Sequence, residues 1–234
     1  VYRRSGARHT ATLTPTADEN GHYKAGVWVR DSGAGIGTMS FVDPQRGTFA
    51  GLGHSISDAD TGADLTLLSG EIVPVTITGC IRGAAGSPGE LRGEFAAAPA
   101  GTVLANDAAG VYGSYTGSCT APALPVANLQ EVTPGEAELW TTVLGTTAQP
   151  YTIQVERVTM TGSDPNRNLL IRVTDKRLLD ATGGVVQGMS GSPIVQNGRL
   201  AAVLTHVLVN DPSRGYAIFA TTMLEKADAV ASSK

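Results

Sequence analysis

Short apolar runs separated by turn residues are the feature that most constrains the fold of this chain. Val, Thr and Ala recur in these runs, and Gly, Pro, Asn or Asp stand between them. Most runs alternate apolar and polar residues with a period of two, which is typical of half-buried β-strands. The sequence therefore predicts an all-β fold. The expected strands are 22–30, 37–42, 47–52, 64–81, 90–95, 101–115, 138–144, 151–159, 169–174, 192–196 and 200–209.

The length and one unpatterned stretch predict two lobes. A chain of 234 residues can bury one large core or two small ones that share a cleft. Residues 119–134 are rich in Pro and Ala and contain no convincing strand pattern. We therefore predict a β-barrel lobe over 1–120, a linker over 121–134 and a second β-barrel lobe over 135–234. Apolar residues at helical spacing over 221–231 predict a short C-terminal helix.

Composition excludes several classes of partner. The formal net charge is −4 and Lys and Arg form no cluster, which argues against nucleic acid and anionic membranes as partners. No apolar stretch approaches the roughly 18 residues of a membrane-spanning helix. The chain opens at Val1 without a signal-peptide pattern. We therefore expect an excised or processed fragment, with any export signal or membrane anchor outside it.

The two cysteines leave two interpretations open. Cys80 and Cys119 lack CxxC spacing and cannot form a zinc site by themselves. They form either one disulfide in an oxidising compartment or two inert buried thiols.

The stretch 186–209 carries the strongest chemical signal. Gly188 and Gly191 flank Ser190, so the backbone can turn sharply and direct the amides of Gly188 and Ser190 at one point, as an oxyanion hole requires. The dipeptide Asn197-Gly198 then predicts a two-residue hairpin, and a long apolar strand follows it. A serine on a sharp turn followed by a hairpin is the arrangement of two-barrel serine peptidases. We therefore predict Ser190 as a nucleophile.

The string GMSGSP resembles the GDSGGP signature of trypsin-like enzymes at four positions. It departs from that signature at Met189, where the signature has an acid, and at Ser192, where it has glycine. The acid-dependent zymogen activation of trypsin therefore has no visible basis here. The resemblance implies a fold of two chymotrypsin-like β-barrels with the active site between them.

A serine hydroxyl needs an adjacent base, and histidine is the usual one. His54 ends the strand-like run GTFAGLGH in the first lobe, which suits a base that reaches across a cleft. His206 is the runner-up, since it lies on the strand after the hairpin. That strand is expected to bind the substrate backbone through Thr205, His206 and Val207.

A carboxylate would complete the site by orienting the imidazole. Asp175 follows an apolar strand and precedes Ser190 by 15 residues (190 − 175), and Asp58 and Asp31 are the alternatives. Asp58 lies in SDADTGAD, where the spacing of possible ligands fits a solvated turn better than a calcium loop. We predict no metal site and no organic cofactor.

Three longer stretches resemble one family, the S55 peptidase domain of the sporulation stage IV B protein. They are VWVRDSGAGIGTMSFVDP from Val27, LGHSISDADTG from Leu52, and the segment from Thr174 that includes GMSGSPIVQNGRLAAVLTHVLV. The resemblance implies that His54, Asp175 and Ser190 form a catalytic triad.

The resemblance also implies a biological role and a longer protein. It implies cleavage of the protein itself and of a regulatory membrane-protein partner between forespore and mother cell, which releases a late sigma factor. Members of the family usually carry an N-terminal membrane anchor and a PDZ domain, so the resemblance implies an extracytoplasmic or secreted protein in which we expect both to lie outside this fragment. The alternative is a catalytically inactive two-barrel module that captures a peptide by strand addition along 205–207.

Overall fold

The computed structural model describes residues 1–4, 6–26, 33–58, 60–162 and 164–232. They form two compact units, Val1–Gly35 and Ile36–Lys234, which are described separately. The smaller unit contains two antiparallel hairpins. Their strands are β1 (Tyr2–Arg4), β2 (Ala7–His9), β3 (Thr16–Ala17) and β4 (Tyr23–Lys24). Only the start of the strand expected over 22–30 can be assessed, because residues 27–30 lie outside the described ranges.

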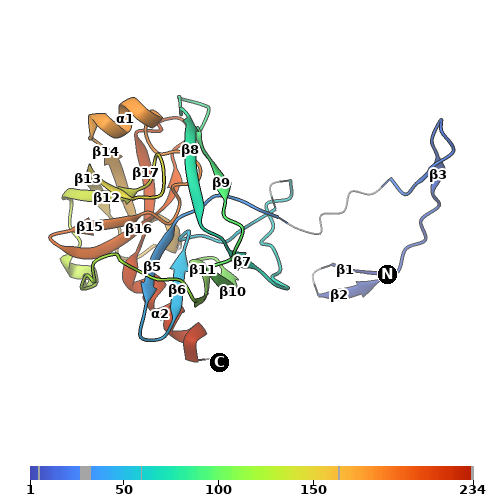
Figure 1. The fold of residues 1–234 in the computed structure, drawn as a ribbon, viewed down its shortest axis with the longest axis horizontal. Helices are drawn as coiled ribbons and strands as arrows, with labels where there is room; N and C mark the ends of the chain where they lie inside the picture. Colours follow the sequence, from blue (N-terminus) through green and yellow to red (C-terminus); the bar gives the residue numbers. More distant parts are fainter. Residues whose placement is uncertain (5, 27–32, 59, 163, 233–234) are drawn as a thin grey trace. The chain divides into compact units, whose positions relative to one another are not determined.

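The larger unit begins with an open antiparallel sheet of five strands in the order β5-β6-β11-β10-β7 (Figure 1). A separate ribbon of two strands, β8 and β9, pairs with itself rather than extending this sheet. The strands are β5 (Met39–Asp43), β6 (Thr48–Gly51), β7 (Glu71–Ile72), β8 (Val75–Ile81), β9 (Glu90–Phe95), β10 (Gly101–Asp107) and β11 (Gly110–Tyr115).

The rest of the larger unit is a closed barrel in the order β12-β13-β14-β17-β16-β15. Short 3-10 helices, η1 (Leu129–Glu131) and η2 (Pro165–Arg167), precede β12 and β14. The barrel strands are β12 (Gly135–Thr141), β13 (Gln149–Val158), β14 (Leu169–Val173), β15 (Pro193–Gln196), β16 (Arg199–Val207) and β17 (Arg214–Phe219). The predicted all-β class is confirmed. The second predicted barrel is closed, whereas the described strands of the first form an open sheet.

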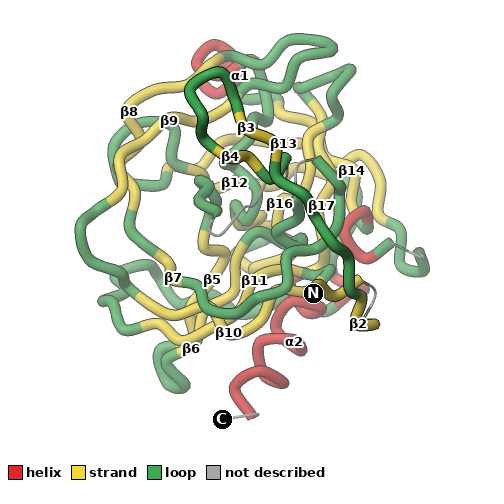
Figure 2. Tube along the Cα trace, turned by 90° about the vertical axis from the view of Figure 1, so that its right-hand side faces the viewer, coloured by secondary structure: helices red, strands yellow, loops and turns green. Residues whose placement is uncertain are grey.

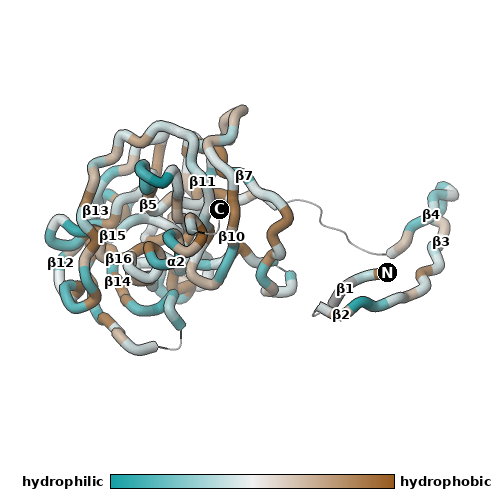
Figure 3. Tube along the Cα trace, turned by 90° about the horizontal axis from the view of Figure 1, so that it is seen from below, coloured by the Kyte–Doolittle hydropathy of each residue, from teal (hydrophilic) through white to brown (hydrophobic). Residues whose placement is uncertain are grey.

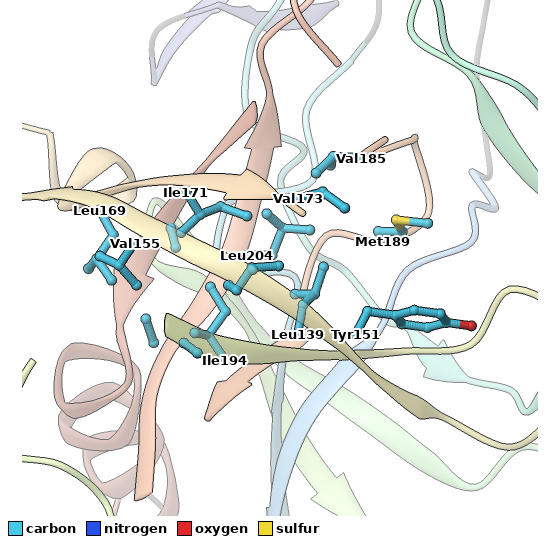
Figure 4. Packing of buried hydrophobic residues seen from close by; sticks show 14 of the residues in the cluster. Leu139, Tyr151, Val155, Leu169, Ile171, Val173, Val185, Met189, Ile194 and Leu204 are labelled. Carbon is cyan, nitrogen blue, oxygen red and sulfur yellow. The ribbon is translucent and has the colours of Figure 1, made fainter. Parts of the chain in front are cut away.

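The main hydrophobic core fills the barrel. Alternate residues of β13 are buried, as the period of two predicts (Figure 4). Burying each large apolar side chain stabilises the fold by about 1.5–3 kcal/mol. In Figure 3, hydrophobic residues lie along strands such as β10 and β15. The core residues labelled in Figure 4 are Leu139, Tyr151, Val155, Leu169, Ile171, Val173, Val185, Met189, Ile194 and Leu204.

The C-terminal helix is confirmed and joins the sheet to the barrel. Helix α2 (Ala220–Ser232) lies next to β11 (Figure 2). It buries Met223 and Ala227 in a cluster that includes Tyr112 of β11 and Ile218 of β17. Because this cluster draws residues from both β structures, it fixes the two relative to each other. No helix in the described ranges is long and apolar enough to cross a membrane.

A second helix, α1 (Lys176–Thr182), was not predicted. Its seven residues are too few for a clear helical period, and only its ends carry signals. Asp175 is its N-cap, with a side chain that accepts a hydrogen bond from the amide of Arg177 at 2.8 Å. Gly183 ends it in the left-handed conformation at φ 77°. The residue predicted to enter the active site from a strand therefore also starts a helix.

Both cysteines are free thiols in the structure. Cys80 on β8 is half-buried and Cys119 is exposed. The structure therefore shows neither of the two arrangements expected for this pair.

Candidate active site

The turn that carries Ser190 is fixed from inside the barrel. Gly188 and Gly191 both have φ of +97°, which L side chains rarely adopt. Between them the Met189 side chain is fully buried in the core (Figure 4). A Cβ atom on Gly191 would lie 1.9 Å from the carbonyl oxygen of Thr38. The two glycines and the buried methionine therefore hold Ser190 at the surface of the core, half-buried.

Two backbone amides of this turn are available as donors. The amides of Met189 and Gly191 donate to Val186 and Leu204, whereas those of Gly188 and Ser190 donate to no acceptor in the described part of the chain. Paired amides of this kind can stabilise an oxyanion. The oxyanion hole formed by Gly188 and Ser190 stays a prediction.

Thr38, just before β5, holds the same turn from the first sheet. Its hydroxyl donates to the carbonyl of Gly188 at 3.2 Å, and its amide donates to the carbonyl of Ser190 at 2.8 Å. The sequence does not predict this contact, because nothing in the string GIGTMS distinguishes a threonine that binds a turn 150 residues away.

The Ser190 hydroxyl donates to the backbone carbonyl of Thr205 on β16 at 2.7 Å. Thr205 is almost fully buried. Its methyl group lies against Gly53, where an added Cβ would be 2.9 Å from Thr205 Cγ2. Thr205 therefore contacts both the nucleophile and the residue that precedes His54.

His54 is placed beside this group by its neighbours in the chain. The amide nitrogen of Leu52 would be 2.7 Å from a Cβ on Gly191, so the segment that leads to His54 packs on the serine turn. The Nδ1 atom of His54 lies 2.7 Å from the carbonyl oxygen of Ser55. Because that oxygen can only accept, we assign the proton to Nδ1, which leaves Nε2 as the basic nitrogen. The structure shows no hydrogen bond between His54 and Ser190, and such bonds commonly tighten only when substrate binds.

His206, the runner-up base, stacks on His54. The centroids of the two rings are 4.9 Å apart and the rings are tilted by 35°. Burial lowers the pKa of His206, and the charges of His54 and Arg167 lower it further. The ring next to the proposed base is therefore neutral at pH 7, where it can form an uncharged wall.

The Asp175 carboxylate binds Arg177 and Thr152 rather than His54. Its carboxylate accepts hydrogen bonds from Arg177 Nη2 at 2.7 Å and from the amide of Thr152 at 3.3 Å. The side-chain hydrogen bond from Arg177 is the main reason that the pKa of Asp175 falls to about 2. Within the described residues, Asp175 makes no hydrogen bond with His54.

The strand register explains this separation. His206 and Leu170 both pair with Tyr216, so they lie at the same level of the barrel. The strand from Leu170 to Val173 then adds about 10 Å before Asp175 is reached. The structure thus brings together Ser190, Thr205, His54 and His206, and it places Asp175 at the far end of β14.

The alternative acids have separate positions. The Asp58 carboxylate accepts hydrogen bonds from the amides of Asp60 and Thr61 in a local turn. Asp31 lies outside the described residues. Among the residues that are described, no group of three or more His, Cys, Asp or Glu side chains could hold a metal ion.

Replacing Asp175 tests its structural role. Asp175→Ala removes the N-cap of α1 and should lower the free energy of unfolding by about 1 kcal/mol at pH 7. Because the pKa of Asp175 in the folded chain is about 2, below the ordinary 3.8, its stabilising effect is present above pH 4 and disappears as the pH falls toward 2. Urea unfolding of both chains across this range should show the difference shrinking. An equal difference at pH 2 and pH 7 would contradict the prediction.

The fold and this site define a class. A closed β-barrel beside a second β-sheet, with a serine on a glycine-flanked turn and a histidine packed at the same place, is the arrangement of a serine peptidase. Residues 21–224 match the family model described as SpoIVB peptidase S55, so the chain belongs to this family and is a serine peptidase.

The solved structures that match this chain are distant from it in sequence. The active form of the Rv3671c protease from M. tuberculosis is 17% identical, with 87% of this chain and 93% of that chain covered and a TM-score of 0.40. The HtrA-type protease AlgW is 13% identical, with 83% and 62% covered and a TM-score of 0.42. A mutant of human heparin binding protein (CAP37) is 12% identical, with 84% and 82% covered and a TM-score of 0.39. Comparison with curated proteins finds no match.

Proposed function

We propose that this chain is an endopeptidase that cleaves itself and a membrane-associated regulatory protein in the signalling that activates a late sigma factor during sporulation. The family match over residues 21–224 is the observation that supports this proposal. The place of action is then extracytoplasmic, in the space between forespore and mother cell, and the full-length protein carries a PDZ domain. The substrate backbone pairs with the strand formed by Thr205, His206 and Val207.

The catalytic steps follow from the site. The Ser190 hydroxyl turns from the Thr205 carbonyl to Nε2 of His54, which takes its proton as the oxygen attacks a peptide carbonyl. The amides of Gly188 and Ser190 stabilise the tetrahedral oxyanion. His54 then protonates the leaving amine, and a water molecule repeats the sequence to release the acyl group. No metal or organic cofactor enters these steps.

The role of Asp175 as the acid that orients His54 is also proposed, on the family resemblance. In the structure, the Ser55 carbonyl faces Nδ1 of His54, so this role requires the Asp175 carboxylate to leave Arg177. Asp175→Asn is the discriminating variant, since asparagine is an equally good N-cap and preserves α1. A fall in kcat/KM of about 10⁴ in a chain of normal stability would support the role. An unchanged kcat/KM would contradict it and leave Asp175 with the helix alone.

Self-cleavage is tested by mixing two forms of the chain. An inert, isotope-labelled Ser190→Ala chain serves as substrate, and the unlabelled wild-type chain serves as enzyme. We expect labelled fragments with one or a few defined new termini in mass spectrometry. An intact labelled chain, together with normal labelling of the wild-type serine by a fluorophosphonate, would contradict self-cleavage without contradicting the serine mechanism.

The signalling role is tested by complementation. In a spore-forming bacterium, this chain replaces the peptidase domain of the resident stage IV B protein, and a reporter for the late sigma factor is measured. Restored reporter activity that depends on Ser190 would support the proposed pathway. A domain that is proteolytically active in the same cells and restores nothing would overturn it.

A further inference from the structure

Asn166, in η2, connects the barrel to the first sheet next to the nucleophile. Its side-chain amide donates to the carbonyl of Ala108 at 2.7 Å, and Ala108 lies in the turn between β10 and β11. Its backbone carbonyl accepts a hydrogen bond from the Thr205 hydroxyl at 2.6 Å. A single residue on a short 3-10 helix therefore joins a turn of the sheet to the strand that receives the Ser190 hydroxyl.

Thr205 connects Asn166 to the catalytic residues. Its three groups have three different partners: the hydroxyl binds Asn166, the carbonyl accepts from Ser190, and the methyl group packs on Gly53. A shift of Thr205 would therefore move the acceptor of the nucleophile and the support of His54 together. A displacement of about 1 Å in a catalytic site can lower the rate about 100-fold.

The Oδ1 atom of the Asn166 side chain lowers the stability of the folded chain. This atom is buried and has no hydrogen-bond partner among the described residues. Leaving a buried polar atom unpaired costs about 1–3 kcal/mol. Because Asn166→Ala also removes this unpaired atom, the variant regains part of the stability that it loses with the side chain.

We propose that Asn166 is a positioning residue of the catalytic site, which holds Thr205 in register with Ser190 and His54 by tying the barrel to the first sheet. This inference rests on the proposed serine mechanism. It predicts that Asn166 and Thr205 act on the chemical step through one shared link, rather than on probe binding.

The test measures the inactivation of the chain by a fluorophosphonate as a maximal rate, kinact, and a binding constant, KI. Asn166→Ala and Thr205→Val should each lower kinact about 10- to 100-fold and leave KI unchanged. The double variant should be no slower than the slower single variant, because both substitutions break the same link. Thr205→Ser keeps the hydroxyl and should restore most of kinact.

Asn168 provides a matched control in the same turn. Asn168 is buried, whereas Asn166 is half-buried. The side-chain amide of Asn168 donates to the carbonyl of Thr159 at 3.2 Å, and its Oδ1, like that of Asn166, is buried without a partner among the described residues. It makes no hydrogen bond to Thr205. Asn168→Ala should therefore lower the melting temperature and preserve kinact.

Three results would overturn the proposal. They are a folded Asn166→Ala chain with wild-type kinact, a Thr205→Val chain no slower than Thr205→Ser, and fully additive losses in the double variant. The Thr205 pair keeps the test decisive if Asn166→Ala fails to fold. A wild-type chain whose serine takes up no probe would instead overturn the serine mechanism on which this proposal rests.

Discussion

Ser190→Ala is expected to lower kcat by about 10⁶ while the chain stays folded. Among the residues that the structure describes, the Ser190 hydroxyl makes one hydrogen bond, to the Thr205 carbonyl, and the side chain is half-buried. Its removal therefore costs little stability, because the turn is held by Met189, by the glycines and by Thr38. The measurement is turnover of an unfolded protein substrate, together with mass-spectrometric location of a fluorophosphonate adduct in the wild type.

Ser192 is the matched control, since it lies two residues further along the same turn. Its side chain is fully buried, and its hydroxyl is 3.5 Å from the Thr38 hydroxyl, which is too long for a strong hydrogen bond. Ser192→Ala should therefore retain most of the activity and of the adduct. If Ser190→Ala kept substantial turnover, or if the adduct formed on Ser192, the assignment of the nucleophile would be wrong. A wild-type chain with neither turnover nor adduct would favour the inactive peptide-binding module.

The parts of the site that the sequence predicts are local ones. Asn197 and Gly198 have φ of +52° and +71°, as a tight two-residue hairpin requires, and the pair was recognised from its two letters alone. The turn around Ser190 was predicted for the same reason, since the glycines that permit it are its direct neighbours. The backbone conformation of a tight turn depends on the residues within it, so it can be predicted without knowledge of the fold.

The parts that the sequence does not predict depend on residues far apart in the chain. Thr38 binds the serine turn across 150 positions, and Asn166 binds Thr205 across 39. Neither has a local signature, because any hydroxyl or amide at the right point in space could make the bond. The open first sheet was not predicted for a similar reason. The alternation of apolar and polar residues predicts that β8 and β9 are strands, but it does not say that they pair with each other instead of joining the sheet. Asp175 shows the limit most clearly: its position at the end of β14 was predicted, but its bonds to Arg177 and Thr152 were not.

His54→Ala is expected to abolish turnover nearly as completely as Ser190→Ala, because a serine hydroxyl without a base is a weak nucleophile. Residues that act as one unit give non-additive losses, so the double variant should be no slower than either single variant. The Ser55 carbonyl and the His206 ring hold the imidazole from two sides. The measurement is turnover of the unfolded protein substrate in the two single variants and the double variant, together with the rate of fluorophosphonate labelling of Ser190 in the wild type and in His54→Ala at saturating probe.

His206→Phe separates the two candidate bases. Phenylalanine preserves a flat ring against His54 at 4.9 Å between centroids but cannot take a proton. If His54 is the base, His206→Phe should label at a rate much nearer to that of the wild type than His54→Phe does. If His206 were the base, this order would be reversed. The physical reason for expecting the first order is the proton on Nδ1 of His54, which the Ser55 carbonyl fixes and which leaves Nε2 free to accept from Ser190.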